Sequence, residues 1–230
     1  MKRRDFIKAM GAGAGLAAAL FGGCNLSSPD KAQGKSIASA APDNSPNSAK
    51  GKKNMKIVVI TGSPHKAGTS ALLADKFIEG ATKSGHHVFR FNAAFEEVHP
   101  CTGCDACGMN GPCIFKDSME KLNPELLAAD LVAFVTPLYY WGMSAQLKAV
   151  IDRFYSNNSR LHVKKKAILM ATAWDANDWT MSALTAHYKT LLRYMGWDDV
   201  GMVLAIGCGV RSDIERSDFP NQAYQLGLKV

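Results

Sequence analysis

The sequence contains no long hydrophobic run, and its first 54 residues contain few acidic side chains. The most apolar N-terminal stretch, from Ala9 to Gly23, is too short and too rich in Gly and Ala to predict a membrane span. Residues 1–54 hold nine Lys and Arg against three Asp and Glu, whereas residues 55–230 hold eighteen against seventeen. The net charge of +7 therefore belongs mostly to the N-terminal segment. The nearly neutral remainder argues against a nucleic-acid-binding protein.

Residues 1–23 are predicted to be an export signal. Arg3 and Arg4 are followed by Phe6 and Lys8, which resembles the twin-arginine pattern R-R-x-F-x-K. The alternative is a chance basic start before a soluble helix, although the glycines that follow would weaken any helix. The resemblance implies export by the twin-arginine route, to the periplasm or to the outer side of a membrane.

Cys24 ends the sequence LFGGC, which resembles a lipoprotein box. Lipidation of Cys24 would tether the protein to a membrane, and ordinary cleavage or an uncleaved anchor are the alternatives. Residues 24–54 are rich in Ser, Ala, Pro, Asn and Lys and have no periodic apolar pattern, which predicts a disordered linker. The remaining residues, 55–230, are expected to form one folded domain.

Apolar runs alternate with helical patterns along this domain. The runs predict strands over 56–61, 87–92, 130–136, 166–172 and 200–206. The helical patterns cover 69–84, 118–128, 144–156, 178–195 and 213–227. This alternation predicts an α/β fold, a flavodoxin-like doubly wound five-stranded parallel sheet with helices on both faces. Such sheets bind FMN at the carboxyl ends of their strands, so the loops after the first, third and fourth strands are expected to carry the function.

The loop after the first predicted strand has the composition of a phosphate site. Gly62 permits a tight turn, Ser63, Thr69 and Ser70 supply hydroxyls, and a helix start supplies backbone N–H groups. The loop is neither a Walker P-loop nor a G-x-G-x-x-G dinucleotide motif. It therefore predicts a binding site for a ligand with a single phosphate group, and FMN is the commonest ligand of that kind. The alternative is an ordinary strand-to-helix turn without a ligand.

The loop after the third predicted strand is apolar and aromatic. Three consecutive aromatic residues at a strand end suit a wall against a flat heteroaromatic ring. The alternative is packing in a dimer interface or at a corner of the core. The expected ring-contacting residues are Pro137, Leu138, Tyr139, Tyr140, Trp141 and Gly142. In the helix that follows, Lys148 and Asp152 are expected to pair, and Asp152 and Arg153 to be structural rather than catalytic.

Four cysteines, Cys101, Cys104, Cys107 and Cys113, are spaced C-x2-C-x2-C-x5-C before the second helix of the domain. The close spacing resembles an iron–sulfur motif more than a zinc site, which usually pairs two C-x2-C units across a longer gap. The alternatives are zinc, disulfides or free thiols. Cys208 has no cysteine near it in sequence and is expected to be a buried, inert thiol.

The stretches GSPHKAGTS and TPLYYWGMSAQLKAVIDR, with the cysteine block between them, resemble the NADPH-dependent FMN reductase and iron-sulfur flavoprotein branch of the flavodoxin-like proteins. The resemblance implies non-covalent FMN, NAD(P)H as a donor, a [4Fe-4S] cluster on the four cysteines, and homodimers or tetramers. His65 stands where the family often has Arg, and Thr69 where it often has Asn. By position, the phosphate would be held by Ser63, His65, Thr69 and Ser70, and the ring by residues 137–142 and Thr172.

These features predict an exported FMN-dependent oxidoreductase. A reduced donor, NAD(P)H or a protein, would reduce the flavin, which would pass electrons to a small-molecule or protein acceptor, directly or through the cluster. The first alternative is a non-catalytic flavin and iron–sulfur electron carrier, because nicotinamide cofactors are chiefly cytoplasmic. A binding module with a zinc- or disulfide-stabilised loop is the second alternative.

Overall fold

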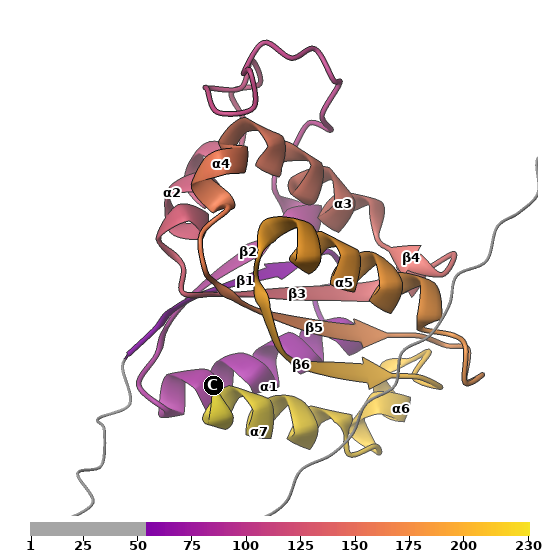
Figure 1. Ribbon diagram of the computed structural model, residues 1–230. Coiled ribbons are helices and arrows are strands. Elements are labelled where there is room, and N and C mark those ends of the chain that lie inside the picture. Colours follow the sequence, from indigo (N-terminus) through magenta and orange to yellow (C-terminus); the bar gives the residue numbers. More distant parts are fainter. Residues whose placement is uncertain (1–53) are drawn as a thin grey trace, which may run out of the picture. The chain divides into compact units, whose positions relative to one another are not determined.

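Five parallel strands form the centre of the molecule, in the order β2-β1-β3-β5-β6, and a short β4 pairs antiparallel with β3 (Figure 1). The computed structural model describes residues 54–230, so the predicted export signal, Cys24 and nearly all of the linker lie outside the described residues. The strand order is the one expected of a flavodoxin-like sheet, and the predicted fold class is confirmed. The strands are β1 (Lys56–Thr61), β2 (His87–Asn92), β3 (Leu131–Tyr139), β4 (Gly142–Met143), β5 (Lys166–Thr172) and β6 (Asp198–Ala205).

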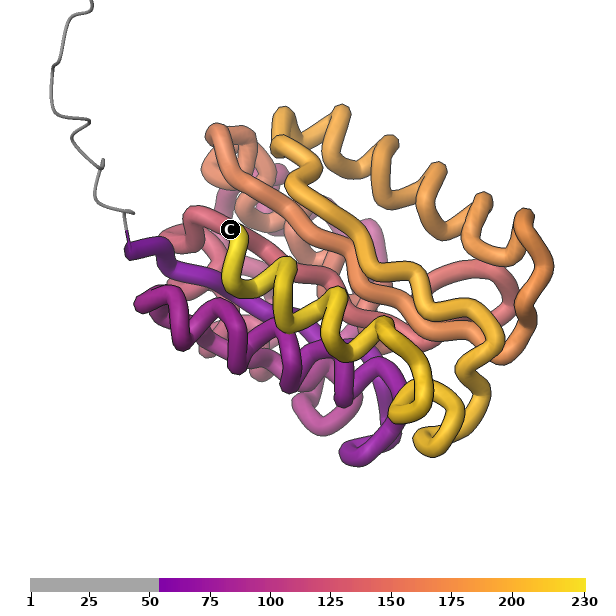
Figure 2. Tube along the Cα trace, turned by 90° about the horizontal axis from the view of Figure 1, so that it is seen from below, coloured from indigo at the N-terminus to yellow at the C-terminus, as the bar shows by residue number. Residues whose placement is uncertain are grey.

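Helices cover both faces of this sheet. Figure 1 shows α1 and α7 below it and α2, α3 and α5 above it, and Figure 2 shows α7 running beside α1. Among the described residues, no helix is long and apolar enough to cross a membrane. The helices are α1 (Thr69–Lys83), α2 (Met119–Ala128), α3 (Ala145–Asp152), α4 (Asn158–Leu161), α5 (Ser182–Met195), α6 (Arg211–Glu215) and α7 (Phe219–Lys229), with 3-10 turns η1 (Ala93–Phe95) and η2 (Arg153–Asn157).

The central strands β1, β3 and β5 are apolar along most of their length because both of their faces are buried, whereas the edge strands β2 and β6 are only partly buried. Successive side chains of β1 point to opposite faces, so Val58 and Ile60 join the core under α2, α3 and α5. Ile57 and Val59 join the core under α1 and α7. Two hydrophobic cores thus hold the sheet in place and fix the loops that follow its strands.

The structure differs from the predicted elements at two main points. β3 runs three residues further than predicted and turns into β4, so the expected loop is a hairpin. Pro137 lies in this extension and pairs with Thr172, but β1 ends opposite Val135 and leaves Pro137 without a neighbour on that side. The helix predicted over 213–227 is two helices, since the chain breaks before Pro220, which lies in the first turn of α7.

Candidate functional site

A cavity of about 770 Å³ opens at the carboxyl ends of β1, β3 and β5. This is the edge of the sheet at which doubly wound folds bind ligands. The cavity is lined by residues of four segments: the loop before α1, the end of β3, the end of β5 and the segment before α6. Its lining includes Ser63, His65, Lys66, Gly68, Thr69, Pro137, Leu138, Tyr139, Thr172, Trp174, Cys208 and Arg211.

The loop from Gly62 to Gly68 leads into the start of α1, which presents hydrogen-bond donors to this cavity. Gly68 is the N-cap of α1, whose first turn has no side-chain cap and no acidic residue. The backbone N–H groups at the helix start therefore remain available for an anion. The Ser63 hydroxyl accepts a hydrogen bond from the His65 N–H at 3.1 Å, which leaves its own proton free to donate.

Two further hydroxyls of the predicted phosphate site lie at the start of α1. The Thr69 Oγ1 and Thr172 Oγ1 atoms are 2.9 Å apart and share a hydrogen bond. This bond joins the start of α1 directly to the end of β5. Ser70 does not line the cavity; its Oγ is buried and has no hydrogen-bond partner among the described residues. A buried hydroxyl without a partner is costly, and an anion or water at the helix start would satisfy it.

Arg211 brings a positive charge to the same loop. Its Nη1 donates to the carbonyl oxygens of Ala67 and Gly68 at 3.3 and 3.4 Å, while its Nε pairs with Glu215 at 2.7 Å. The side chain lines the cavity and comes from α6, far from the loop in sequence. Sequence reasoning missed it because no spacing rule connects residues 144 positions apart.

The β3–β4 hairpin forms the opposite wall of the cavity. Pro137, Leu138 and Tyr139 line it, as predicted for residues next to a ring. Tyr140 and Trp141 are the hairpin turn, with φ of 46° and 59°, the left-handed pattern of a type I′ turn.

The turn residues belong to a neighbouring hollow rather than to the main cavity. Tyr140 and Trp141 line a smaller cavity of about 330 Å³ with Trp174 and Asp175, and Gly142 lines neither cavity. Trp141 stacks on Trp179, with ring centroids 5.6 Å apart. The aromatic wall is therefore split between two adjoining cavities.

The residues at this site fit FMN. The cavity is large enough for a cofactor, and its apolar wall at β3 faces a loop that offers N–H and hydroxyl donors. A Cβ on Gly68 would lie 3.0 Å from the His65 Cβ and 3.5 Å from the Ser63 Oγ, so the loop is a cradle that a larger residue would fill. The unpartnered Ser70 hydroxyl lies at the same helix start. The assignment of individual FMN contacts to Ser63, His65, Thr69, Ser70, residues 137–142 and Thr172 stays a prediction.

Cys208 is buried, as predicted, and lines the main cavity. Burial raises the pKa of its thiol, which keeps the group protonated at neutral pH. Trp174 and Arg211, with Gly209 and Val210, complete this side of the lining. Trp174 lies in the loop after the fourth predicted strand, where function was expected, although the residue itself was not named; Gly209, Val210 and Arg211 lie in a segment without a phosphate or aromatic motif and were not expected at the site.

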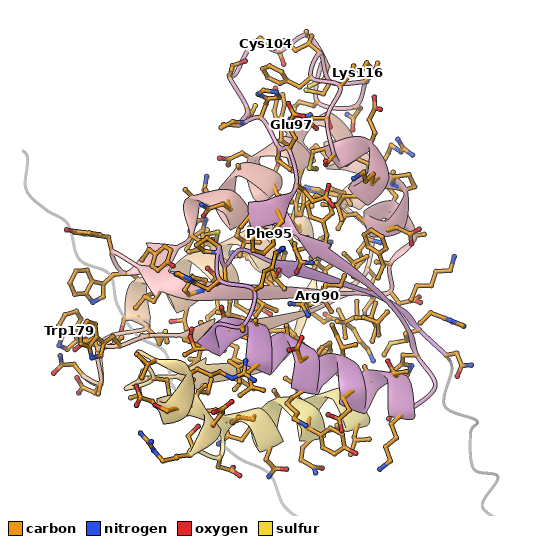
Figure 3. The ribbon with its side chains drawn as sticks, turned by 180° about the vertical axis from the view of Figure 1, so that it is seen from behind. Arg90, Phe95, Glu97, Cys104, Lys116 and Trp179 are labelled. Atoms are coloured by element: carbon orange, nitrogen blue, oxygen red, sulfur yellow. The ribbon has the colours of Figure 1, made fainter. Side chains whose placement is uncertain are left out.

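The cysteine-containing loop projects from the body of the molecule above α2 and α3 (Figure 1), and Figure 3 places Cys104 near its far end. Its base is closed by a buried ion pair. Arg153 Nη1 lies 2.6 Å from Asp117 Oδ2 and also donates to the His99 carbonyl at 2.8 Å. Asp117 in turn accepts the N–H groups of His99 and Met119, each at 3.0 Å. The predicted structural role of Arg153 is confirmed, and Lys148 and Asp152 pair at 2.5 Å as expected.

The four cysteines do not converge within the described residues. All four are free thiols; Cys101 and Cys104 are exposed, and Cys107 and Cys113 are half-buried. In the part of the chain that the structure describes, no three Cys, His, Asp or Glu side chains form a group able to hold a metal. As the loop is placed here, the four thiols are not gathered around one centre, so the predicted [4Fe-4S] cluster is not shown.

Comparisons with known proteins agree with this fold and site. A family model described as NADPH-dependent FMN reductase matches residues 55–209. An iron-sulfur flavoprotein of Archaeoglobus fulgidus is 28% identical over 178 residues, which cover 76% of this chain and 79% of that protein. An iron-sulfur flavoprotein of Methanosarcina thermophila is 34% identical over 99 residues, 43% of this chain and 52% of that protein. The match thus spans about half the length of this second relative.

Among solved structures, an NAD(P)H:quinone oxidoreductase from Methanothermobacter marburgensis superposes with a TM-score of 0.64. It is 20% identical, and the match covers 76% of this chain and 96% of that one. The azoreductase AzrA superposes with a TM-score of 0.61 at 14% identity, covering 76% and 99% of the two chains. At these identities the likeness establishes the fold alone.

Proposed function

This chain belongs to the NADPH-dependent FMN reductase family, and on that premise we propose that it is an oxidoreductase that uses FMN with NAD(P)H or a protein as electron donor. The observation that carries the proposal is the cavity at the strand ends, where an uncapped helix start faces the apolar end of β3. When bound there, FMN would supply a ring that accepts a hydride and passes electrons on.

The chain's own residues would bind and orient the cofactor. The N–H groups at the start of α1, the Ser63 hydroxyl and the Arg211 guanidinium are positioned to hold a phosphate. The end of β3 would cover one side of the ring with Pro137, Leu138 and Tyr139. Trp174, 86% exposed at the mouth of the cavity, would be partly buried by a bound ring and would exclude water from it.

The first test is the visible spectrum of the full chain purified without oxygen, with FMN quantified. We expect a flavin spectrum with about one FMN per chain and its loss in the S63A/T69A/S70A variant. The control is T190A, because the Thr190 hydroxyl only bonds its own helix, at the Ala186 carbonyl. An undiminished flavin content in the triple variant would contradict the assignment of the FMN phosphate to Ser63, Thr69 and Ser70. A wild-type protein without flavin would contradict the proposed function.

The identity of the electron donor distinguishes a reductase from a non-catalytic electron carrier. Steady oxidation of NADPH or NADH by the FMN-loaded protein, in the presence of an acceptor, supports the reductase. Exchange of electrons with protein partners alone, without NAD(P)H oxidation, would identify a non-catalytic carrier.

A [4Fe-4S] cluster on Cys101, Cys104, Cys107 and Cys113 remains part of the proposal. Its support is the four-thiolate donor set and the similarity to proteins named iron-sulfur flavoproteins. Since the thiols stand apart in this structure, a cluster requires the loop to rearrange. About four irons per chain after anaerobic purification, lost in C104S/C107S, would support the cluster, whereas FMN without iron would remove it.

We further propose that the protein is exported by the twin-arginine route, is held to a membrane through Cys24, and assembles as a homodimer or tetramer. Arg3, Arg4 and the sequence before Cys24 support export and anchoring. Tyr140, 97% exposed at the hairpin turn, supports a subunit contact there. Cell fractionation of wild type and R3K/R4K tests the export, and light scattering of the purified chain tests the assembly.

A further inference from the structure

A cavity of about 460 Å³ lies at the amino ends of the strands, the edge of the sheet opposite the cofactor cavity. Residues at or just before the starts of β1, β3, β5 and β6 line it, together with the end of α7. Figure 1 shows this edge on the left, where the described chain enters β1 and α7 ends, whereas β4 lies at the other edge. With Lys56, the first residue of β1, its lining lysines form a set that we refer to as the basic edge: Lys56, Lys164, Lys165, Lys166 and Lys229.

Most of the charge on the basic edge is not neutralised. Lys166 and Lys229 are exposed, and neither makes a hydrogen bond or ion pair with any described residue. Lys164 lies 3.6 Å from Asp198 with both side chains largely exposed, and such a pair is weak. Asp130, Asp198 and the Val230 carboxylate offset part of the charge, which leaves the five lysines in excess.

Lys165 contributes a buried ammonium group to the same cavity. Its side chain is only 4% exposed, and its Nζ donates to the carbonyl oxygens of Leu127 and Ala129 at 3.0 and 2.5 Å. An ammonium group has three hydrogens, so one donor stays without a partner in residues 54–230. Burial lowers the pKa of this group, and the Asp130 carboxylate opposes the shift only in part. An anion in the cavity would stabilise the buried charge.

Exposed apolar side chains lie next to the lysines. Val163 directly precedes Lys164 and is 48% exposed, and Tyr194, near the end of α5, is 56% exposed. The Tyr194 ring contacts the His162 ring at a centroid distance of 4.7 Å, so Tyr194 lies beside the same segment. Tyrosine favours the interface between a membrane and water, and lysines near it attract anionic lipid headgroups. The combination is therefore typical of a surface that rests on a bilayer.

The chain also enters the folded domain at this edge. The Met55 N–H donates to His86 Nδ1 at 3.2 Å, and His86 Nε2 lies 2.9 Å from the Val230 carbonyl oxygen. The start of the domain is thus joined to the end of α7. In the sequence before Met55, three lysines follow Asp43 without another acidic residue: Lys50, Lys52 and Lys53. The segment that links the domain to Cys24 therefore adds positive charge next to the basic edge.

We propose that the basic edge, with Val163 and Tyr194, is a docking surface for a bilayer of anionic phospholipids, whose headgroup phosphates bind at the 460 Å³ cavity. The inference rests on the proposed anchoring through Cys24 for its place in the cell, whereas the surface itself belongs to the folded domain. The six residues of β1 separate the two edges of the sheet by about 20 Å. The cofactor cavity then faces away from the bilayer, so the electron donor and acceptor reach it from the aqueous phase.

The first test is flotation of the full chain carrying C24S, which cannot be lipidated, with vesicles of phosphatidylglycerol and phosphatidylcholine in equal parts. Vesicles of phosphatidylcholine alone are the comparison. We expect binding to the anionic vesicles only, and its loss at about 0.5 M salt, because salt screens the attraction. K166Q/K229Q is expected to lower the partition coefficient at least tenfold.

The matched control for these two lysines is K66Q/K189Q, which removes the same charge from exposed side chains outside the basic edge. Residues 1–23 are identical in all variants, so any membrane affinity of their own affects each variant equally. The proposal is overturned if the wild-type surface binds both kinds of vesicle equally or neither of them. Equal partition coefficients for K166Q/K229Q and K66Q/K189Q would overturn it as well.

The tryptophans of the chain report how the domain lies on the vesicle. Three of them are exposed at the cofactor edge, Trp141, Trp174 and Trp179, while Trp197 is buried. Figure 3 shows Trp179 at the opposite end of the molecule from the start of β1. With brominated acyl chains, which quench only at short range, we expect unchanged fluorescence from the C24S chain and quenching in its V163W variant. Quenching of the native tryptophans, or none in V163W, would overturn the proposal.

These measurements separate the docking surface from the proposals on which it depends. The C24S chain tests the surface without a lipid, while cell fractionation of the wild type tests the anchoring through Cys24. The flavin content of the same samples tests the oxidoreductase. A wild type that is not anchored in cells would contradict the anchoring, and vesicle binding by the C24S chain would still decide the surface.

Discussion

Arg153 and Asp117 form an ion pair at 2.6 Å with side chains only 3% and 0% exposed. The pair joins η2 to the end of the cysteine-containing loop, and Arg153 also donates to the carbonyl of His99 at the start of that loop. A backbone bond from the Ser118 N–H to the Glu97 carbonyl at 2.9 Å closes the same base. The projecting loop is therefore anchored at a hydrogen-bonded base, beyond which Cys101 and Cys104 are exposed and Cys107 and Cys113 are half-buried.

We expect D117N to lower the free energy of unfolding by about 3–5 kcal/mol, because it leaves the Arg153 charge buried without a counter-ion. Urea denaturation of the full chain measures this loss. The matched control is D152N, which breaks the pair with Lys148 on the helix surface, where both side chains are about 40% exposed. That pair is worth less than about 1 kcal/mol. Equal effects of D117N and D152N would contradict the role assigned to Asp117.

The same pair predicts a pH dependence of stability. Burial raises the pKa of the Asp117 carboxyl, but hydrogen bonds from Arg153, His99 and Met119 lower it more, so the pKa lies below its ordinary value. A pKa lowered on folding stabilises the folded state above the unfolded pKa, near 3.8. This contribution is lost as the pH falls through the folded value.

The difference in unfolding free energy between wild type and D117N should accordingly stay constant from about pH 7 to pH 5 and shrink below about pH 4. Denaturant titrations at a series of pH values measure it. A difference that grows on acidification would show that the sign of the pKa shift is wrong.

R211Q is expected to raise the dissociation constant of FMN about tenfold, which corresponds to the loss of one charge-assisted hydrogen bond. Gln keeps much of the side-chain length but removes the charge beside the Ala67 and Gly68 carbonyls. Fluorescence titration of FMN into the flavin-free protein measures the change. R216Q is the control, because Arg216 pairs with Asp213 at the far end of α6 and does not line the cavity. FMN binding that weakens equally in both variants would remove Arg211 from the site.

The strands and the phosphate loop could be predicted because their signals are local. A parallel strand buried on both faces is a nearly continuous apolar run, and β1 and β5 begin and end where their runs were predicted to. The hairpin at Tyr140 and Trp141 was missed, because two bulky residues with positive φ carry none of the usual Asn or Gly turn signals.

Contacts between distant segments could not be predicted in the same way. Arg211 reaches the phosphate loop and Asp117 meets Arg153 only after the sheet has placed their elements. Neither residue belongs to a motif, so its role depends on tertiary contacts alone. The cysteines show the converse case, because a close spacing in sequence did not bring the four thiols together.

The contact between α1 and α7 depends on two glycines. A Cβ on Gly80 would lie 2.2 Å from the Tyr224 carbonyl oxygen, and one on Gly227 would lie 2.3 Å from the Phe77 carbonyl oxygen. Both obstacles are backbone atoms, so a new methyl group can be accommodated only if one helix moves away from the other. Such overpacking costs about 1–3 kcal/mol for each site.

G80A and G227A are therefore expected each to lower the free energy of unfolding by about 1–3 kcal/mol, although Ala is the better helix former by about 1 kcal/mol. The opposing helix preference makes the sign of the result informative, since a stabilised variant would mean that the helices do not touch. The control is G142A, whose Cβ would meet only the Tyr139 carbonyl oxygen at 3.8 Å. Thermal and urea unfolding of the three variants measures these changes in the free energy of unfolding. A loss confined to G80A and G227A shows that the close approach of α1 and α7 stabilises the sheet face beneath the cofactor cavity.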